Sequence, residues 1–178
     1  LIFFKLSTLF NVTLLLVYFK LYKMKIEVGN VAPDFTLPAT DKKMYTLSEN
    51  RDKNTVILFF PLAFTGTCTA ELCSIRDNYH DYEKLDAHVI AISVDAYATL
   101  AKFKEMENYN FPLLSDFNKD AIYKYDTVYE NFAAGLKGVA KRSAFVVDKK
   151  GIIRYAEVLE NAGELPNFAA IQETLQNL

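Results

Sequence analysis

Two strongly apolar runs constrain the fold of this 178-residue chain more than any other feature. The runs are Thr55–Phe60 and Val89–Val94, and both are rich in residue types that favour strands. A strand with one face in water alternates polar and apolar residues, whereas an unbroken apolar run is typical of a strand covered on both faces. The sequence therefore predicts buried central strands in a sheet with other elements packed on both sides.

Segments with helical spacing separate and follow these strands. In Cys68–Leu85, apolar residues recur at intervals that place them on one broad face of a helix. Further helices are expected over Ala96–Asn108, over Lys119–Tyr125 and from Pro166 onward, where proline suits a first turn. Strands and helices thus alternate along the chain, which is the pattern of an α/β protein.

A hairpin closes the predicted sheet near the carboxyl end. Ser143–Asp148 and Ile152–Ala156 are strand-like and flank a short turn that contains Gly151. Shorter extended segments precede the hairpin, at Ala32–Leu37, Lys43–Leu47 and Phe111–Ser115. A parallel front half followed by an antiparallel hairpin predicts an α/β, thioredoxin-like fold, with a central mixed sheet flanked by helices.

The first 23 residues differ from the rest of the chain. Leu1–Lys23 contains three lysines, no acidic residue and a dense set of apolar side chains. Its longest uncharged run, Leu6–Phe19, is shorter than the roughly 20 residues that a membrane-spanning helix needs. We expect Met24 to be the natural start, residues 1–23 to be a non-native or upstream segment, and residues 24–178 to form one domain. A membrane anchor is the alternative interpretation of the segment.

Composition argues against several classes of protein. The 20 Lys and Arg residues against 22 Asp and Glu give a net charge of −2, and no basic block favours nucleic acid. Two cysteines are too few for a disulfide-stabilised scaffold. We therefore expect a cytoplasmic protein, or a membrane-associated one if residues 1–23 are native.

One cysteine lies where a thiol becomes reactive. Cys68 follows the first apolar strand and the connecting run Pro61–Thr67, at the start of the next predicted helix. Unpaired backbone N–H groups and the helix dipole favour negative charge at that position. Because the thiolate is the nucleophilic form of cysteine, this placement predicts a nucleophilic site. A buried structural thiol is the alternative.

The residues around this cysteine resemble a known motif. Pro61, Thr65 and Cys68 reproduce the Pro-x-x-x-Thr-x-x-Cys signature of peroxiredoxins, with a strand before it and a helix after it. Three more blocks resemble that family in the same order, namely Ala32–Leu37, Phe111–Asp116 and Arg142–Asp148. The resemblance extends over Met24–Leu178 and is closest to the alkyl hydroperoxide reductase E type. It implies a thiol-dependent peroxidase for hydrogen peroxide and organic hydroperoxides, with no cofactor or metal.

The resemblance also implies a role for each site residue. Cys68 would attack one peroxide oxygen and become a sulfenic acid. Thr65 would accept the peroxide proton and donate to the oxygen under attack, Pro61 would shape the loop, and Arg142 would stabilise developing charge. Glu71 would either assist the site electrostatically or only stabilise the helix start. A capping Thr65, a strand-ending Pro61 and a surface Arg142 are the structural alternatives.

Cys73 leaves the recycling step open. On a regular helix, residues five apart are separated by about 7.5 Å along the axis, so Cys68 and Cys73 need an unwound turn to form a disulfide. Q-type peroxiredoxins use this spacing for a resolving cysteine, whereas E-type members commonly use one cysteine and an external thiol. The expected partners are a peroxide, a reductant (thioredoxin, glutaredoxin or a low-molecular-weight thiol) and a second copy of the chain in a homodimer.

Other functions use some of the same residues. The soft ligands available to a metal are Cys68, Cys73, His80 and His88. Their spacing matches no common zinc pattern, and the C-x-x-C motif of thioredoxin-type reductases is absent. A peroxide sensor or redox relay, in which Cys68 passes its oxidation to a partner protein, uses the same chemistry. It is the alternative to a peroxidase.

Overall fold

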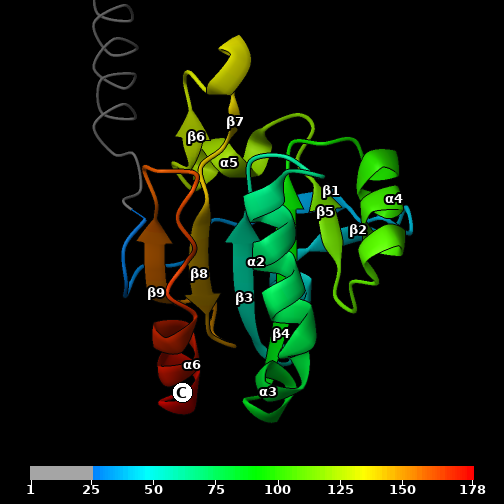
Figure 1. The fold of residues 1–178 in the computed structure, drawn as a ribbon. Helices are drawn as coiled ribbons and strands as arrows, with labels where there is room; N and C mark the ends of the chain where they lie inside the picture. The colour runs from blue at the N-terminus through cyan, green and yellow to red at the C-terminus, as the bar shows by residue number, and fades with distance from the viewer. Residues whose placement is uncertain (1–25) are drawn as a thin grey trace, which may run out of the picture.

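The computed structural model describes residues 26–178, which contain a five-stranded mixed sheet with helices packed on it (Figure 1). In spatial order, the strands are β5 (Leu113–Ser115), β4 (Ala87–Ser93), β3 (Asn54–Phe59), β8 (Ser143–Val147) and β9 (Ile153–Val158). The first three are parallel, and β8 pairs antiparallel with both β3 and β9. The predicted mixed sheet, parallel at the front and closed by a hairpin, is confirmed.

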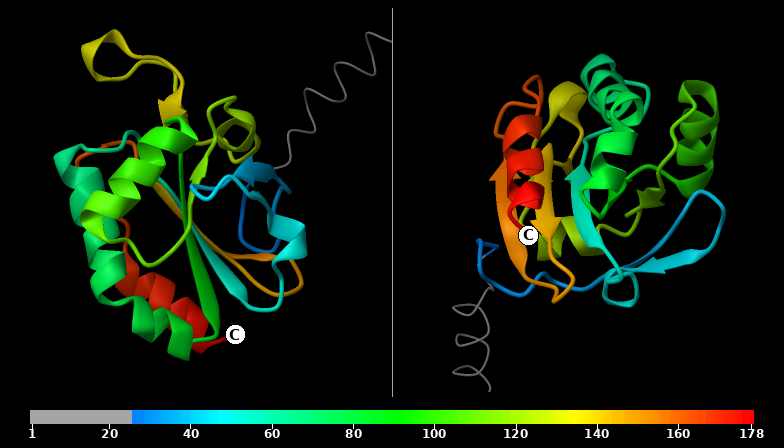
Figure 2. Two further views of the ribbon diagram at one scale, coloured as in Figure 1. Left: turned by 90° about the vertical axis from the view of Figure 1, so that its right-hand side faces the viewer. Right: turned by 90° about the horizontal axis from the view of Figure 1, so that it is seen from below.

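The central strand β3 contributes to the core on both of its faces, as its unbroken apolar run predicts. Val56 and Leu58 pack on one side, and Ile57 and Phe59 pack on the other. The helices on the first side are α2 (Gly66–Asp77), α3 (Tyr79–Lys84), α4 (Tyr97–Glu107) and α6 (Phe168–Gln176). The elements on the second side are α5 (Asp120–Lys124), β1 (Thr36–Pro38), β2 (Met44–Thr46) and the 3₁₀ turn Leu47–Glu49. Figure 2 shows the two layers on opposite faces of the sheet.

The region predicted as one long helix is two helices. The helix expected over Cys68–Leu85 begins earlier, at Gly66, and is interrupted at Asn78, between α2 and α3. The Asn78 side-chain amide donates to the Ser74 carbonyl at 2.8 Å, and its backbone leaves the helical region (φ −109°, ψ 14°). Asparagine side chains compete in this way with the hydrogen bonds of a helix. The spacing of apolar residues is the same on both sides of Asn78, so that spacing does not reveal the break.

The other helices lie close to their predicted positions. α4 and α5 fall within the ranges expected for them. α6 begins at Phe168 rather than at Pro166, because the Asn167 side chain caps it by accepting a hydrogen bond from the Ala170 N–H at 3.0 Å.

A small hairpin precedes the sheet strand β8 and was not predicted. β6 (Val128–Tyr129) pairs antiparallel with β7 (Val139–Ala140), and a 3₁₀ turn, Ala133–Gly135, lies between them. The hairpin projects beyond the upper end of the sheet in Figure 1. Strands of two residues are too short to show any periodicity, so the sequence pattern does not reveal them.

The expectations for residues 1–23 and for a domain start at Met24 lie outside the described residues, and they stay predictions. Within residues 26–178, no helix has the length and apolar character needed to cross a membrane.

Candidate active site

Cys68 is buried at the start of α2, beyond the carboxyl end of β3. It is the third residue of the helix, and its side chain joins the core with a residue exposure of 1%. The first hydrogen bond of the helix runs from the Thr69 N–H to the Thr65 carbonyl at 2.9 Å, so the N–H groups before Thr69 have no acceptor within the helix. The thiol therefore lies in the positive field of a helix N-terminus, as predicted.

Thr65 occupies the cap position of α2 without acting as a side-chain cap. Its hydroxyl donates instead to the Leu62 carbonyl at 3.0 Å, and it makes no capping hydrogen bond. This bond uses the hydrogen of the hydroxyl and leaves the oxygen lone pairs available as acceptors. Simple capping therefore does not explain the hydroxyl at this position.

Pro61 and Phe64 shape the loop between β3 and α2. Phe60 still donates its N–H to Ile92 at 3.0 Å, and the pairing stops at the buried Pro61, which has no N–H. Phe64 has a left-handed backbone (φ 62°), an unfavourable conformation for an aromatic residue. Its ring contacts Phe103 of α4 at a centroid distance of 4.7 Å. The loop is thus held in a specific turn immediately before Thr65.

Arg142 comes from the segment between β7 and β8 and contacts the thiol. Its Nη2 lies 3.3 Å from Cys68 Sγ, and the side chain is almost completely buried. The Ala162 carbonyl accepts hydrogen bonds from Nη2 at 3.0 Å and from Nε at 3.3 Å. The structure thus brings together two residues that the sequence separates widely, and the surface interpretation of Arg142 is wrong.

Glu71 lies one turn after Cys68 and binds the other side of the same guanidinium. Its Oε2 accepts a hydrogen bond from Arg142 Nη1, while its buried Oε1 has no hydrogen-bond partner among residues 26–178. Burial raises the pKa of Glu71 to about 7, against the lowering effect of Arg142. Burial alone would lower the pKa of Arg142, but Glu71 and Cys68 raise it above its usual value. The guanidinium is therefore permanently charged.

Cys73 lies on the same continuous helix but has different neighbours. Its half-buried thiol lies 3.7 Å from Glu107 Oε2, at the end of α4. Burial raises the pKa of Tyr109, and the nearby Cys73 raises it further. Both cysteines are free. Cys68 contacts Arg142 next to β8, whereas Cys73 contacts the end of α4, so α2 directs the two thiols to different surroundings.

The histidines considered as metal ligands are apart from the thiol site. His80 Nδ1 lies 3.5 Å from Glu83, and His88 Nε2 lies 3.2 Å from Asp52 at the amino-terminal end of the sheet. Among residues 26–178 there is no group of three or more His, Cys, Asp or Glu side chains placed to hold a metal ion.

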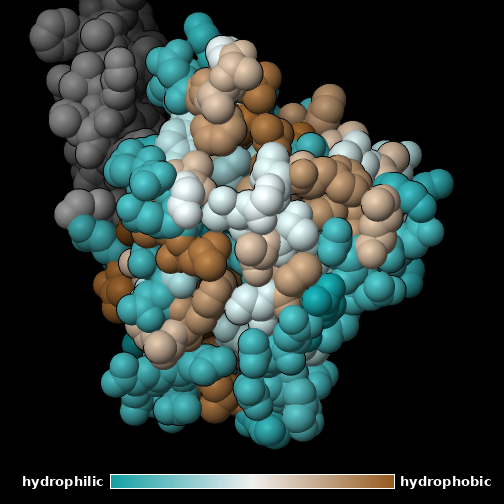
Figure 3. All heavy atoms as spheres, in the orientation of Figure 1, coloured by the Kyte–Doolittle hydropathy of each residue, from teal (hydrophilic) through white to brown (hydrophobic). Residues whose placement is uncertain are grey.

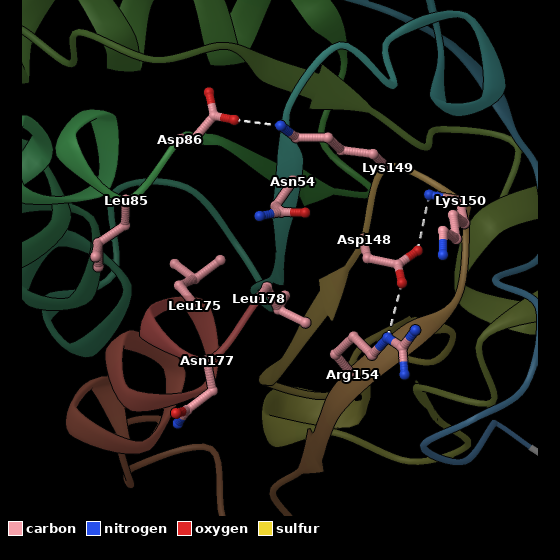
Figure 4. Close-up of a pocket in the computed structure, with 10 residues that line it drawn as sticks. All are labelled: Asn54, Leu85, Asp86, Asp148, Lys149, Lys150, Arg154, Leu175, Asn177 and Leu178. Atoms are coloured by element: carbon pink, nitrogen blue, oxygen red, sulfur yellow. Dashed lines mark hydrogen bonds and ion pairs between the residues drawn. The ribbon is translucent and has the colours of Figure 1, made fainter.

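A pocket of about 500 Å³ lies at the opposite end of the sheet from Cys68 (Figure 4). Asn54, the first residue of β3, is in its lining, whereas Cys68 follows the last residue of that strand. Four of its charged side chains are paired across the rim, Lys149 with Asp86 and Arg154 with Asp148. Neither cysteine is among the residues that line this pocket, so it is separate from the thiol site.

Asp95 is a residue near the site that the sequence pattern did not identify. It lies in the loop between β4 and α4, and its carboxylate accepts a hydrogen bond from the Ala63 backbone N–H at 2.8 Å. The only local signal is a serine at the end of a buried strand, followed two residues later by an acidic residue. An acceptor for a distant backbone N–H leaves no recognisable motif in the sequence.

Comparison with known proteins identifies the class to which this fold and site belong. The AhpC/TSA family model matches residues 28–156, and the chain belongs to that family. The predicted class of peroxiredoxins with a thioredoxin-like fold is thereby confirmed, and the protein is a thiol-dependent peroxidase.

Individual relatives agree with this assignment. The chain is 41% identical over 142 residues to alkyl hydroperoxide reductase E of Mycobacterium tuberculosis, covering 79% of this chain and 90% of the relative. It is 35% identical over 130 residues to peroxiredoxin Bcp of Bacillus subtilis, covering 72% and 82%. Among solved structures, peroxidoxin BcpB of Mycobacterium tuberculosis matches with a TM-score of 0.77 and 26% identity, covering 86% of this chain and 99% of that one.

Proposed function

We propose that this protein reduces hydrogen peroxide and small organic hydroperoxides with Cys68 as the nucleophile. The observation that carries the proposal is the buried contact of 3.3 Å between Arg142 Nη2 and Cys68 Sγ at the start of α2. A permanent cation and a helix N-terminus act on one sulfur, and both favour the thiolate. The name of the mycobacterial relative, alkyl hydroperoxide reductase E, supports the substrate class.

The proposed reaction transfers two electrons from sulfur to the peroxide. The Cys68 thiolate attacks the terminal oxygen of R–O–O–H, and an S–O bond forms as the O–O bond breaks. The leaving R–O⁻ takes up a proton and departs as an alcohol, or as water when R is hydrogen. Cys68 is left as a sulfenic acid.

Arg142 and Thr65 would act on the oxygens during this step. Negative charge moves from sulfur toward the leaving oxygen, and a fixed guanidinium next to the sulfur stabilises that charge. The Thr65 hydroxyl, which donates to Leu62, has lone pairs free to accept the peroxide O–H and to hold the substrate. Pro61 contributes the shape of the loop and removes an N–H donor.

Glu71 would position Arg142 and share its charge. The carboxylate and the thiolate bind different nitrogens of one guanidinium, so the two anions compete for the same cation. The raised pKa of Glu71 means that its carboxylate takes up a proton near neutral pH. A protonated Glu71 leaves more of the Arg142 charge for Cys68. This arrangement supports an active role for Glu71 over simple stabilisation of the helix start.

For the recycling step, we propose that an external thiol reduces the sulfenic acid, whether thioredoxin, glutaredoxin or a low-molecular-weight thiol. The different surroundings of Cys68 and Cys73 on one unbroken helix support this route. A resolving role for Cys73 needs the first turns of α2 to unwind, because a disulfide needs its Cα atoms within about 7 Å. Such unwinding is the competing route that the experiment below distinguishes.

A cytoplasmic homodimer is the assembly that we propose. Two free cysteines suit a reducing compartment. Among the exposed large apolar side chains are Phe64 (49%) in the active-site loop and Leu136 (44%) in the connection between β6 and β7, and both segments lie toward the upper end of the molecule in Figure 1. Figure 3 shows apolar surface toward this upper end and a mainly hydrophilic lower end. Contact of two copies there would cover these side chains, and sedimentation at increasing concentration measures whether it does.

Peroxide consumption with dithiothreitol as the reductant tests the proposed function. Wild type and Cys73→Ser should turn over many equivalents, and Cys68→Ser should consume none. Turnover by Cys68→Ser would overturn the proposal. A wild type that stops after one equivalent of peroxide would instead indicate the sensor alternative.

Intact-mass analysis after one equivalent of peroxide tests the recycling route. A gain of one oxygen in the wild type supports a one-cysteine cycle. A loss of two hydrogens in the monomer, absent from Cys73→Ser, would establish the Cys68–Cys73 disulfide and overturn the external-thiol route.

A further inference from the structure

Asp95 connects the active-site loop to the end of the sheet. Its Oδ2 accepts hydrogen bonds from the Ala63 N–H and from the Ser93 hydroxyl, both at 2.8 Å. Ser93 is the last residue of β4, and Ala63 lies in the loop that leaves β3. A hydrogen bond from a backbone N–H to a carboxylate is roughly twice as strong as one between neutral groups. Asp95 therefore fixes a loop backbone that the strand pairing no longer controls.

Asp95 is itself held firmly in place. The Ser93 hydroxyl accepts the Asp95 N–H at 3.1 Å, and the Asp95 carbonyl accepts the Ser115 hydroxyl at 2.6 Å. Both serines are buried and are the last residues of β4 and β5. The carboxylate thus takes its position from the sheet and transmits that position to Ala63.

The residues that follow Ala63 are the ones that need to be positioned. Phe64 adopts the left-handed backbone described above, and Thr65 folds its hydroxyl back onto the Leu62 carbonyl. A strained turn of this kind persists only where its surroundings hold it. The hydrogen bond that Ala63 donates to Asp95 holds the residue immediately before the strained one, and so determines where the Thr65 hydroxyl lies.

We infer that Asp95 is a positioning residue for the peroxide reaction proposed above, on which this inference rests. The site has two parts. Thr65 follows the loop residue that Asp95 holds, whereas Cys68 and Arg142 are joined by their own contact of 3.3 Å. Asp95 fixes the loop part relative to the sheet, so that the Thr65 hydroxyl and the Arg142 guanidinium meet the same peroxide. It acts through the Ala63 N–H and does not touch the reacting atoms.

Two rate measurements separate positioning from other effects. The first is the second-order rate constant for oxidation of Cys68 by hydrogen peroxide, which needs the whole site. The second is the rate of alkylation of Cys68 by iodoacetamide in a Cys73→Ser background, which reports the thiolate but needs no peroxide geometry. Asp95→Ala should slow peroxide oxidation by about 10- to 100-fold, the range expected for small displacements of reacting groups. Alkylation should change by less than about threefold, since the contact between Arg142 and Cys68 does not involve the Asp95 carboxylate.

Conservative variants show which property of Asp95 matters. Asp95→Asn keeps a carbonyl oxygen for the Ala63 N–H and should retain most of the peroxide rate, and Ser93→Ala should fall between wild type and Asp95→Ala. Asp81→Ala, which removes an exposed carboxylate on α3, is the control and should behave as wild type. Thermal unfolding of each variant monitors the fold, and the Asn and Ser93 variants carry the test if Asp95→Ala does not fold.

Three outcomes overturn the inference. They are a peroxide rate for Asp95→Ala equal to that of the wild type, an Asn variant as slow as the Ala variant, and a parallel loss of alkylation and peroxide rates. Failure of the proposed function looks different, because the wild type itself would then lack rapid peroxide oxidation of Cys68.

Discussion

Arg142 and Glu71 form an ion pair inside the protein, where their side chains are 1% and 0% exposed. A buried pair adds stability only when further hydrogen bonds satisfy both groups. The Ala162 carbonyl does this for Arg142, but the second oxygen of Glu71 has no partner among the described residues. The pair therefore contributes more to the placement of the guanidinium at Cys68 than to the stability of the fold.

Arg142→Lys should slow oxidation of Cys68 by peroxide by about 100- to 1,000-fold, because lysine lacks the planar fork that binds Glu71 and sulfur on separate nitrogens. The acid limb of the pH–rate profile should also move to higher pH. Stopped-flow measurement of peroxide consumption across pH 5–9 provides both readouts. Lys141→Gln, which removes the neighbouring cation paired with Glu160, is the matched control and should keep the wild-type profile. An unchanged profile in Arg142→Lys would contradict the role of Arg142.

Thr65→Val should lower the peroxide rate by about 10- to 100-fold, since it removes the hydroxyl but keeps the shape of the side chain. Thr65→Ser restores the hydroxyl and should recover most of the rate. Because the Thr65 hydroxyl caps no helical N–H, neither variant should lose more than about 1 kcal/mol of stability in urea titration. Equal peroxide rates for valine and serine would show that the hydroxyl has no part in the reaction.

Glu71→Gln should change how stability depends on pH. Burial raises the pKa of Glu71 in the folded protein to about 7, from an ordinary value of 4.5. Between these values the folded state binds more protons than the unfolded chain, so the contribution of Glu71 is present below pH 4.5 and is lost as the pH rises through 7. The free energy of unfolding of the wild type, taken relative to Glu71→Gln, should therefore decrease across this window. A difference that stays constant or increases with pH would refute this assignment.

Cys73→Ser should retain at least about half of the peroxide rate of Cys68, because its thiol contacts Glu107 and lies away from Arg142. Single-turnover oxidation measures this step without the recycling reaction. Glu107→Gln, which replaces the neighbour of Cys73, should likewise leave the step unchanged. A large loss in either variant would mean that the two thiols are coupled despite their different surroundings.

The sequence predicts the parts of the fold that have long, uniform patterns. The buried runs of β3 and β4 and the hairpin turn at Gly151 specify the sheet almost completely. The break at Asn78 and the hairpin of β6 and β7 escape prediction, because a single side-chain hydrogen bond decides the first and two-residue strands form the second. A sequence pattern detects features that extend over many residues, whereas the break at Asn78 and the hairpin of β6 and β7 each depend on very few.

The residues of the site likewise divide into those that local sequence predicts and those that it does not. Helix position and motif spacing identify Cys68 and Thr65, since both depend on neighbours in the chain. Nothing local to Arg142 indicates that it reaches a sulfur on α2, and only its resemblance to a family block predicted that role. Asp95 has neither kind of signal, because its partner is a backbone N–H that every residue except proline provides.

The Ala162 carbonyl has a consequence for how the thiol could be controlled. It accepts hydrogen bonds from two nitrogens of Arg142 and belongs to the segment that joins β9 to α6. A movement of that segment takes the guanidinium's backbone anchor with it, although no atom of α2 moves. The reactivity of a cysteine in the first half of the chain is thus set partly by one peptide group close to its carboxyl end.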